Sequence, residues 1–364
     1  MPFHFNGQAY TTGELKQHAQ GQLLLALPAW ELNLWKFVSA WLNDEPTITV
    51  HTSGSTGTPK SIHLPKDKVR NSALMTAQYL GLGQDSTALL SLSANYIAGK
   101  MMLVRAMENG WHLWATEPSN HPLQHLPETV ELDLVAWVPS QLQAMLDLQN
   151  GSLNQRIYAI KNIILGGSPV QPQLAEVLKE FPNRVFETFG MTETISHIAM
   201  KRLSGPDAQG VFETTDDNII LGSDERDCLV IIAPLLADKP VITNDIIELK
   251  DGRHFRWLGR VDNVVNSGGI KLFPETLERK IQPLFTQRFF LAGVPDLQLG
   301  QKIILVLEGP ELNHHQVEQL RDQLQTALTR YEMPRGIYSF SNFEETATKK
   351  VNRPATLKKL GLTQ

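Results

Sequence analysis

The sequence His51-Thr52-Ser53-Gly54-Ser55-Thr56-Gly57-Thr58-Pro59-Lys60-Ser61 sets the expectations for the rest of the chain. Residues 47–50 before it and 61–65 after it alternate between apolar and polar types, so each segment is predicted to be a strand. The stretch is then a loop between two strands. Its glycines let backbone N–H groups approach an anion, its hydroxyls donate hydrogen bonds and Lys60 supplies a positive charge. This combination is typical of a loop that binds phosphate.

The spacing in this loop excludes a Walker A motif. That motif has four residues between its first glycine and a Gly-Lys pair, and a helix follows. Counting from Gly54, the second glycine falls at Pro59, and the segment after Lys60 is predicted to be a strand. The simpler alternative is a surface hairpin, but such turns usually carry Asn-Gly or Asp-Gly. The density of hydroxyl residues favours phosphate binding.

The composition of the whole chain limits the class of protein. With 364 residues, of which 42% are apolar and 20% charged, the chain is long enough for two or three globular domains. A net charge of −5 without any basic run argues against nucleic acid as a partner. The single cysteine, Cys228, excludes an internal disulfide, and we find neither a signal-peptide pattern nor a membrane span. We therefore expect a cytoplasmic protein, and the sequence assigns no oligomeric state.

Strand-like and helix-like segments alternate up to residue 190. The predicted strands cover residues 87–93, 111–116, 134–139, 162–168 and 185–190. The predicted helices cover residues 29–42, 66–80, 99–109 and 172–181. This alternation indicates an α/β fold with a parallel sheet, in which ligands bind beyond the carboxyl ends of the strands. Residues 166–168 and 190–193 lie at two such ends.

The pattern changes at about residue 204. Short predicted strands separated by turns follow, at residues 218–221, 227–233, 246–249 and 255–259, which indicates a small β subdomain. The last hundred residues combine a predicted hairpin (264–272), helices (274–285 and 313–331, the second with Asn313 as N-cap) and strands (289–294, 303–307 and 336–340), which indicates a compact α+β unit. We therefore predict an N-terminal domain over residues 1–260, with the β subdomain at about 204–260, and a C-terminal domain over residues 263–364.

Several ordered motifs resemble those of the acyl-adenylate-forming superfamily, which comprises acyl- and aryl-CoA ligases, luciferases and adenylation domains. The loop fits the family pattern T-S-G-[ST]-T-G-x-P-K at Thr52, Ser53, Gly54, Ser55, Thr56, Gly57 and Lys60. Residues 189–193 resemble Y-G-x-T-E, residues 243–245 T-G-D, residues 259–262 G-R-x-D and residues 346–353 T-x-x-G-K-x-x-R. The resemblance implies a large α/β domain followed by a small mobile domain.

The resemblance also assigns roles to these positions. The residues implied to bind ATP, beside the loop, are Gly166, Gly167 and Ser168 at the adenine, Phe189 and Gly190, Asp245 at the ribose hydroxyls, and Arg260 at the ribose or phosphate. The residues implied to act in adenylation are Arg260, Thr192 at the phosphate, Glu193 as the Mg²⁺ ligand and Lys350 as the adenylation lysine, with Asp262 as the hinge near residue 262. Phe189 stands where the family has tyrosine, and Asn244 and Lys349 stand where it has glycine.

Each polar residue also has a simpler interpretation when it is considered alone. Glu193 is also suited to the N-terminus of a helix, where the dipole favours a carboxylate. Asp245 has the character of a turn residue, Arg260 of a surface ion pair and Lys350 of a solvated charge. The order and spacing of the whole set favour the functional interpretation.

The acid substrate is indicated by residues 93–105. Gly99 followed by Arg105 resembles the o-succinylbenzoate–CoA ligases of menaquinone biosynthesis, which accept an aromatic dicarboxylate. An arginine beside the pocket is able to pair with the carboxylate that does not react, although a surface arginine on a helix is the alternative. The residues implied to contact the acid are Tyr96, Gly99, Arg105, Ser168 and Thr194.

The expected reaction has two steps. A carboxylate attacks the α-phosphate of ATP, pyrophosphate leaves, and the acyl-adenylate then reacts with the thiol of coenzyme A. Negative charge builds on the phosphate, so donors, Mg²⁺ and lysines must be in place beforehand. The alternatives are another aryl- or acyl-CoA ligase, a stand-alone adenylation domain that loads a carrier protein, and a non-catalytic adenylate-binding protein in which Asn244 and Lys349 mark lost activity.

Overall fold

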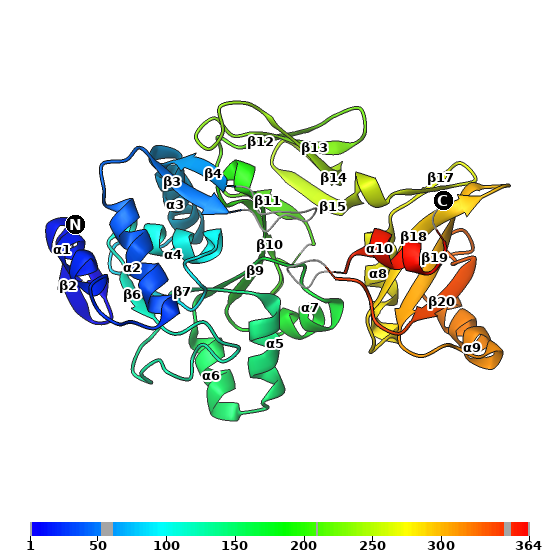
Figure 1. Cartoon of the computed structure of the whole chain (residues 1–364), viewed down its shortest axis with the longest axis horizontal. Coiled ribbons are helices and arrows are strands. Elements are labelled where there is room, and N and C mark those ends of the chain that lie inside the picture. Colours follow the sequence, from blue (N-terminus) through cyan, green and yellow to red (C-terminus); the bar gives the residue numbers. More distant parts are fainter. Residues whose placement is uncertain (1, 52–60, 209, 346–350, 363–364) are drawn as a thin grey trace.

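The computed structural model describes residues 2–51, 61–208, 210–345 and 351–362. Figure 1 shows a large body formed by the first 260 residues and a smaller body, beside it, formed by the last hundred. The predicted phosphate loop at residues 52–60 and the predicted adenylation lysine, Lys350, lie outside the described residues. None of the helices within the described ranges is long and apolar enough to cross a membrane.

The centre of the large body is a parallel sheet, as predicted. Its strands run in the order β6, β5, β7, β8 and β9. Their bounds are β5 (Thr87–Leu90), β6 (His112–Ala115), β7 (Leu134–Trp137), β8 (Asn162–Leu165) and β9 (Arg184–Gly190). The inner strands β7 and β8 are buried on both faces, which explains their continuous apolar sequences. The predicted α/β class is confirmed.

Two layers of helices cover this sheet. One layer consists of α2 (Ala29–Trp41), α3 (Lys66–Leu80) and α4 (Ile97–Asn109), and the other of α5 (Pro139–Asp147), α6 (Gly151–Ala159) and α7 (Pro172–Lys179). Alternate residues of a strand pack in the two hydrophobic cores, one on each face of the sheet, because successive side chains of a strand point to opposite faces. Within β8, for example, Ile164 packs in the α2–α4 core and Ile163 in the α5–α7 core.

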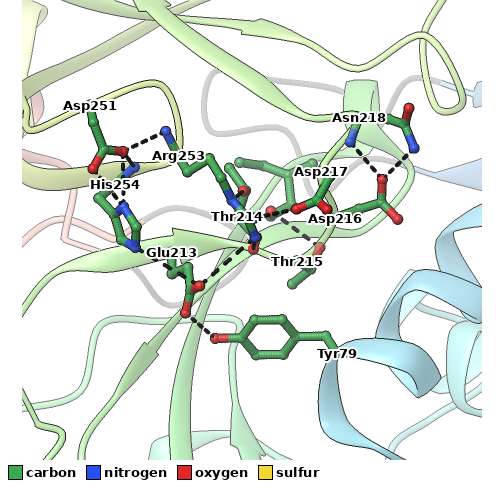
Figure 2. A network of polar contacts seen from close by, with 11 residues as sticks. Tyr79, Glu213, Thr214, Thr215, Asp216, Asp217, Asn218, Asp251, Arg253 and His254 are labelled. Carbon is green, nitrogen blue, oxygen red and sulfur yellow. Dashed lines mark hydrogen bonds and ion pairs between the residues drawn. The ribbon is translucent and has the colours of Figure 1, made fainter.

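The sheet continues beyond β9 with antiparallel strands. The order is β9, β10 (His197–Arg202), β11 (Phe212–Thr214), β15 (His254–Arg260), β14 (Val241–Leu249), β13 (Cys228–Ile232) and β12 (Ile220–Ser223). The strands of the predicted β subdomain are therefore hydrogen-bonded into the same sheet as the parallel strands. A polar network around Glu213 and Arg253 also joins this extension to α3 (Figure 2).

The opposite edge of the sheet carries the start of the chain. The hairpin of β1 (Phe3–Phe5) and β2 (Gln8–Tyr10) pairs with β6 through β1, and α1 (Thr12–Gln22) follows it. The predicted strands on either side of the phosphate loop are present as β3 (Thr47–His51) and β4 (Ser61–Pro65). They form a separate two-stranded sheet in which Thr47 pairs with Pro65 and His51 with Ser61.

The smaller body has its own sheet and its own core. Its strands are β16 (Val265–Ser267), β17 (Ile270–Leu272), β18 (Phe289–Asp296), β19 (Gly300–Glu308) and β20 (Gly336–Phe340). Its helices are α8 (Pro274–Ile281), α9 (His314–Gln325) and α10 (Arg353–Lys359). Helix α9 begins after its N-cap Asn313, as predicted, but it ends at Gln325 and not at residue 331. A turn in which the Thr329 N–H donates to Glu332 replaces the last part of the predicted helix.

Candidate active site

A cavity of about 920 Å³ lies between the two bodies. It is bounded by the carboxyl ends of β8 and β9, by β14 and β15, and by α8 of the smaller body. The predicted site residues that line it are Gly167, Ser168, Phe189, Gly190, Glu193, Asp245 and Arg260. Segments that are far apart in the sequence thus meet at the end of the sheet where ligands are expected to bind.

The glycines at the strand ends are required by space and by backbone conformation. Gly167, directly after β8, has φ +82°, which disfavours any side chain. A Cβ on Gly190 would lie 2.3 Å from the Ser196 carbonyl oxygen and 2.4 Å from the His197 Cα. Both glycines line the large cavity with backbone atoms alone.

Asp245 is positioned by the strand next to its own. Its carboxylate accepts a hydrogen bond from the Trp257 indole N–H (2.9 Å) and one from Arg260 (3.4 Å), and Arg260 stands opposite Asp245 in the register of β14 and β15. Asp245 is buried and lines the large cavity together with Trp257 and Arg260. A carboxylate held in this way is suited to accept two vicinal hydroxyls.

Thr192, Glu193 and Thr194 form a single turn of 3₁₀ helix after β9. Glu193 lines the large cavity, whereas Thr192 lines a neighbouring one. Thr194 is fully buried, and its hydroxyl donates to the Ser196 carbonyl (3.0 Å) and accepts from the Met191 N–H (3.2 Å). Thr194, which was predicted to contact the acid, therefore shapes the turn and is not among the described residues that line either cavity.

Further charged residues line the large cavity. Glu187 and Lys201 make a half-buried salt bridge of 2.5 Å across β9 and β10. From the smaller body, Glu278 pairs with Arg353 at 2.9 Å, and burial raises the pKa of Glu278 to about 7 although Arg353 opposes the shift. Glu187, Lys201 and Glu278 occupy ordinary strand and helix positions, so only the assembled fold reveals them, whereas Arg353 belongs to the motif at residues 346–353.

The predicted hinge residue, Asp262, lies in a 3₁₀ turn (Val261–Asn263) between the two bodies. Its carboxylate is exposed and accepts weak hydrogen bonds from Arg260 (3.4 Å) and Asn244 (3.5 Å). Asn244, which replaces a family glycine, thus has a contact of its own at this junction.

A second cavity, of about 480 Å³, shares a wall with the first. Gly167, Thr188, Gly190 and Met191 line both cavities. The side walls of the second one are largely apolar and include Leu92, Met101, Ala136, Trp137 and Ile164. We call it the acyl cavity. Of the predicted acid contacts, Tyr96 and Arg105 line it, whereas Ser168 lines only the large cavity.

Gly99 acts through packing and does not line the acyl cavity. A Cβ at this position would lie 2.3 Å from the Ser93 carbonyl oxygen. The glycine therefore lets α4 pack directly against the loop after β5, and Arg105, six residues further along the same helix, lines the cavity.

Arg105 is the charged group of the acyl cavity. It is 3% exposed, its Nε donates to Thr76 Oγ1 (3.1 Å) and one terminal nitrogen donates to Ser196 Oγ (3.3 Å). Both partners are neutral, no carboxylate in the described ranges forms an ion pair with it, and burial lowers the pKa of Arg105 to about 10. His197 contacts the same Thr76 hydroxyl (3.0 Å), and burial together with Arg105 lowers the pKa of its imidazole.

A large cavity lined by a buried carboxylate and joined to a largely apolar cavity is the arrangement expected of an acyl-adenylate-forming enzyme. Known proteins agree with this class. The family model "AMP-binding enzyme" matches residues 10–217. The chain belongs to this family and is an acid–thiol ligase, which confirms the prediction from the sequence.

Three relatives illustrate the similarity. An acyl-CoA synthetase (AMP-forming)/AMP-acid ligase II-like protein from Dyadobacter fermentans is 37% identical, with a TM-score of 0.63 over 95% of this chain and 98% of that one. The 2-succinylbenzoate–CoA ligase of Listeria innocua is 24% identical over 86% of this chain and 70% of its own. The o-succinylbenzoate CoA synthetase of Bacillus subtilis, in complex with its acyl-adenylate, is 21% identical and shares the fold, with a TM-score of 0.67 over 84% and 68% of the two chains.

Proposed function

We propose that this ligase activates an aromatic dicarboxylate of the o-succinylbenzoate type with ATP and transfers the acyl group to coenzyme A. The observation that carries the choice of acid is Arg105, a buried guanidinium in the acyl cavity that has hydroxyl partners but no carboxylate partner within the described chain. The names of the Listeria innocua and Bacillus subtilis relatives support the same choice.

The physical argument concerns an uncompensated charge. Removing a guanidinium from water is unfavourable by several kcal/mol unless an anion and hydrogen bonds replace the lost solvation. The hydroxyls of Thr76 and Ser196 satisfy part of the hydrogen bonding at Arg105 but supply no negative charge. A substrate with a second carboxylate would supply that charge, while its ring would contact the apolar walls. A monocarboxylate would leave the guanidinium unpaired.

We propose a separate role in the adenylation step for each of the remaining residues. We assign the adenine to Gly166, Gly167, Ser168 and Phe189, and the ribose to Asp245 and Arg260. Thr192 and the loop at residues 52–60 would hold the phosphates, and Lys60 and Lys350 would stabilise the charge that develops on them. Glu193 fits Mg²⁺, because this ion is commonly held by one or two carboxylates together with substrate phosphates. Bound Mg²⁺ would neutralise phosphate charge.

The second step requires access of a thiol to the same acyl-adenylate. We propose residues 1–260 and 263–364 as the two moving domains and Asp262 as the hinge between them. A rotation there would withdraw Lys350 after adenylation and let the smaller domain complete the thioester site. A cytoplasmic location fits the free, buried Cys228.

The experiment that tests this function is pyrophosphate release with a panel of acids, followed by thioester formation with coenzyme A. We expect turnover with o-succinylbenzoate and little with benzoate. Release without thioester formation, until a carrier protein is added, would show a stand-alone adenylation domain. Absence of release with every acid would indicate a non-catalytic adenylate-binding protein.

Replacement of Arg105 tests the choice of acid. We expect Arg105→Ala to raise the KM for o-succinylbenzoate by about 10- to 100-fold, because a charge-assisted hydrogen bond contributes roughly 1.5–3 kcal/mol. The KM for a monocarboxylate of similar size should change little. Arg105→Lys, which keeps the charge but not the fork of donors, should give an intermediate value. Equal effects on both acids would remove Arg105 from substrate recognition.

A further inference from the structure

A third cavity, also of about 480 Å³, lies beside the acyl cavity. The loop at residues 92–96 contributes to both of them. Ser93 and Tyr96 line the acyl cavity, whereas Ala94 and Asn95 line this one. The rest of its wall comes from α2, from the segment that leads into β3, and from β3, β4 and the first turns of α4.

The deepest polar group of this third cavity is the ammonium of Lys100. The residue is 8% exposed, and its Nζ donates to the Ala94 carbonyl (2.9 Å) and the Asn95 carbonyl (3.0 Å) while it lies 5.6 Å from the centre of the Phe37 ring. An ammonium has three hydrogens to donate, so one of them has no acceptor among the described residues. Burial lowers the pKa of Lys100, and no described carboxylate offsets this effect.

A second cation stands at the mouth of the same cavity. Lys36 is exposed and forms no ion pair within the described ranges. It shares one face of α2 with Asn33, Phe37 and Ala40, all of which line the cavity. His63 adds an imidazole ring, and Glu45 is the one carboxylate among the described lining residues. The cavity therefore combines an excess of positive charge with amide groups, which is the surface chemistry that binds phosphate.

We infer that this cavity binds the phosphate groups of coenzyme A, an inference that rests on the proposed function. Coenzyme A carries its thiol at one end of a long flexible arm and its phosphates at the other. The thiol must reach the acyl-adenylate, whereas the phosphates need cations outside both the nucleotide cavity and the acyl cavity. Lys36 and Lys100 offer such cations, separated from the acyl cavity by a single loop.

The test uses Lys36, because its exposed side chain is not part of the core. Thioester formation is measured as a function of coenzyme A and of pantetheine, which has the same thiol but no phosphate. We expect Lys36→Glu to raise the KM for coenzyme A about tenfold, the effect of roughly 1.4 kcal/mol. The KM values for pantetheine, ATP and the acid should stay within about twofold. Lys239→Glu, the same change at another exposed lysine, is the control.

Two results would overturn the inference. In the first, Lys36→Glu leaves the KM for coenzyme A within twofold of the wild-type value, or changes it no more than Lys239→Glu does. The other is an equal change for coenzyme A and pantetheine. Failure of the proposed function has a different signature, because the wild type would then form no thioester with coenzyme A.

Discussion

At the scale of single residues, the carboxylate of Asp245 depends on a neighbour that is outside every motif. The indole N–H of Trp257 donates to one carboxylate oxygen at 2.9 Å and thereby fixes the side chain that we assign to the ribose. Trp257→Phe removes this donor and keeps a ring, so we expect the KM for ATP to rise about fivefold for the loss of roughly 1 kcal/mol. The KM for the acid should not change.

The measurement is initial rates at varied ATP and at varied acid. Trp41→Phe provides a matched control, because the Trp41 indole N–H donates to Glu108 on the far side of the large body. A KM for ATP that responds equally to both variants would show that Trp257 has only a structural role.

Single residues also show where prediction from sequence ends. Arg105 is identifiable because it stands at a fixed distance after Gly99. Its hydrogen-bond partners, Thr76 and Ser196, come from α3 and from the residue before β10, and nothing in their local sequence marks them. They become part of a site only through helix packing against the sheet. Thr194 belongs to a predicted motif, but the motif did not reveal that the Thr194 hydroxyl forms a hydrogen bond within the turn.

At the scale of elements, the end of α3 is fastened to the antiparallel part of the sheet by a polar network (Figure 2). The Tyr79 hydroxyl donates to Glu213 on β11 (3.1 Å), and Arg253 pairs with Glu213 and Asp217. Burial and the Glu213 carboxylate raise the pKa of Tyr79, so its hydroxyl stays protonated and able to donate. This network fixes β11 and β15 relative to the helical layer.

Tyr79→Phe tests that connection. We expect it to lower the free energy of unfolding by about 1–2 kcal/mol, because it leaves a half-buried carboxylate without one of its donors. Urea unfolding measures the loss, and Tyr158→Phe, whose hydroxyl makes no hydrogen bond in the described chain, is the control. A loss no larger than that of the control would mean that the extension is held by the sheet alone.

The periodicity of apolar residues predicted most helices and strands, because most of these elements bury one face or lie within the sheet. Helix α3 and strand β20 have the predicted bounds. Strand β10 was missed, and it is the element that joins the parallel strands to the antiparallel ones. The sequence of β10 begins shortly after the predicted motif at residues 189–193, and no turn signal separates the strand from the motif. Strand β10 continues the sheet into the strands of the predicted β subdomain.

At the scale of the whole molecule, the two bodies meet across the large cavity, and Glu278 of the smaller body lines it. Its carboxylate accepts from Arg353 and from the Leu291 N–H (2.7 Å), yet burial raises its pKa from 4.5 to about 7. The folded protein therefore binds one proton more than the unfolded chain does between these two values. The stability from this group is fully present below pH 4.5 and is lost as the pH rises towards 7 and above.

Glu278→Gln removes that titration and keeps the shape of the side chain. We expect the free energy of unfolding of the wild type to fall by up to about 1 kcal/mol per pH unit between pH 5 and 7, relative to the variant. Urea unfolding at several pH values measures the two slopes, and Glu311→Gln, an exposed carboxylate of the same body, is the control. Parallel slopes for the wild type and Glu278→Gln would show that Arg353 keeps Glu278 ionised in the folded protein, in which case the charge pair itself holds α10 against α8 at every physiological pH.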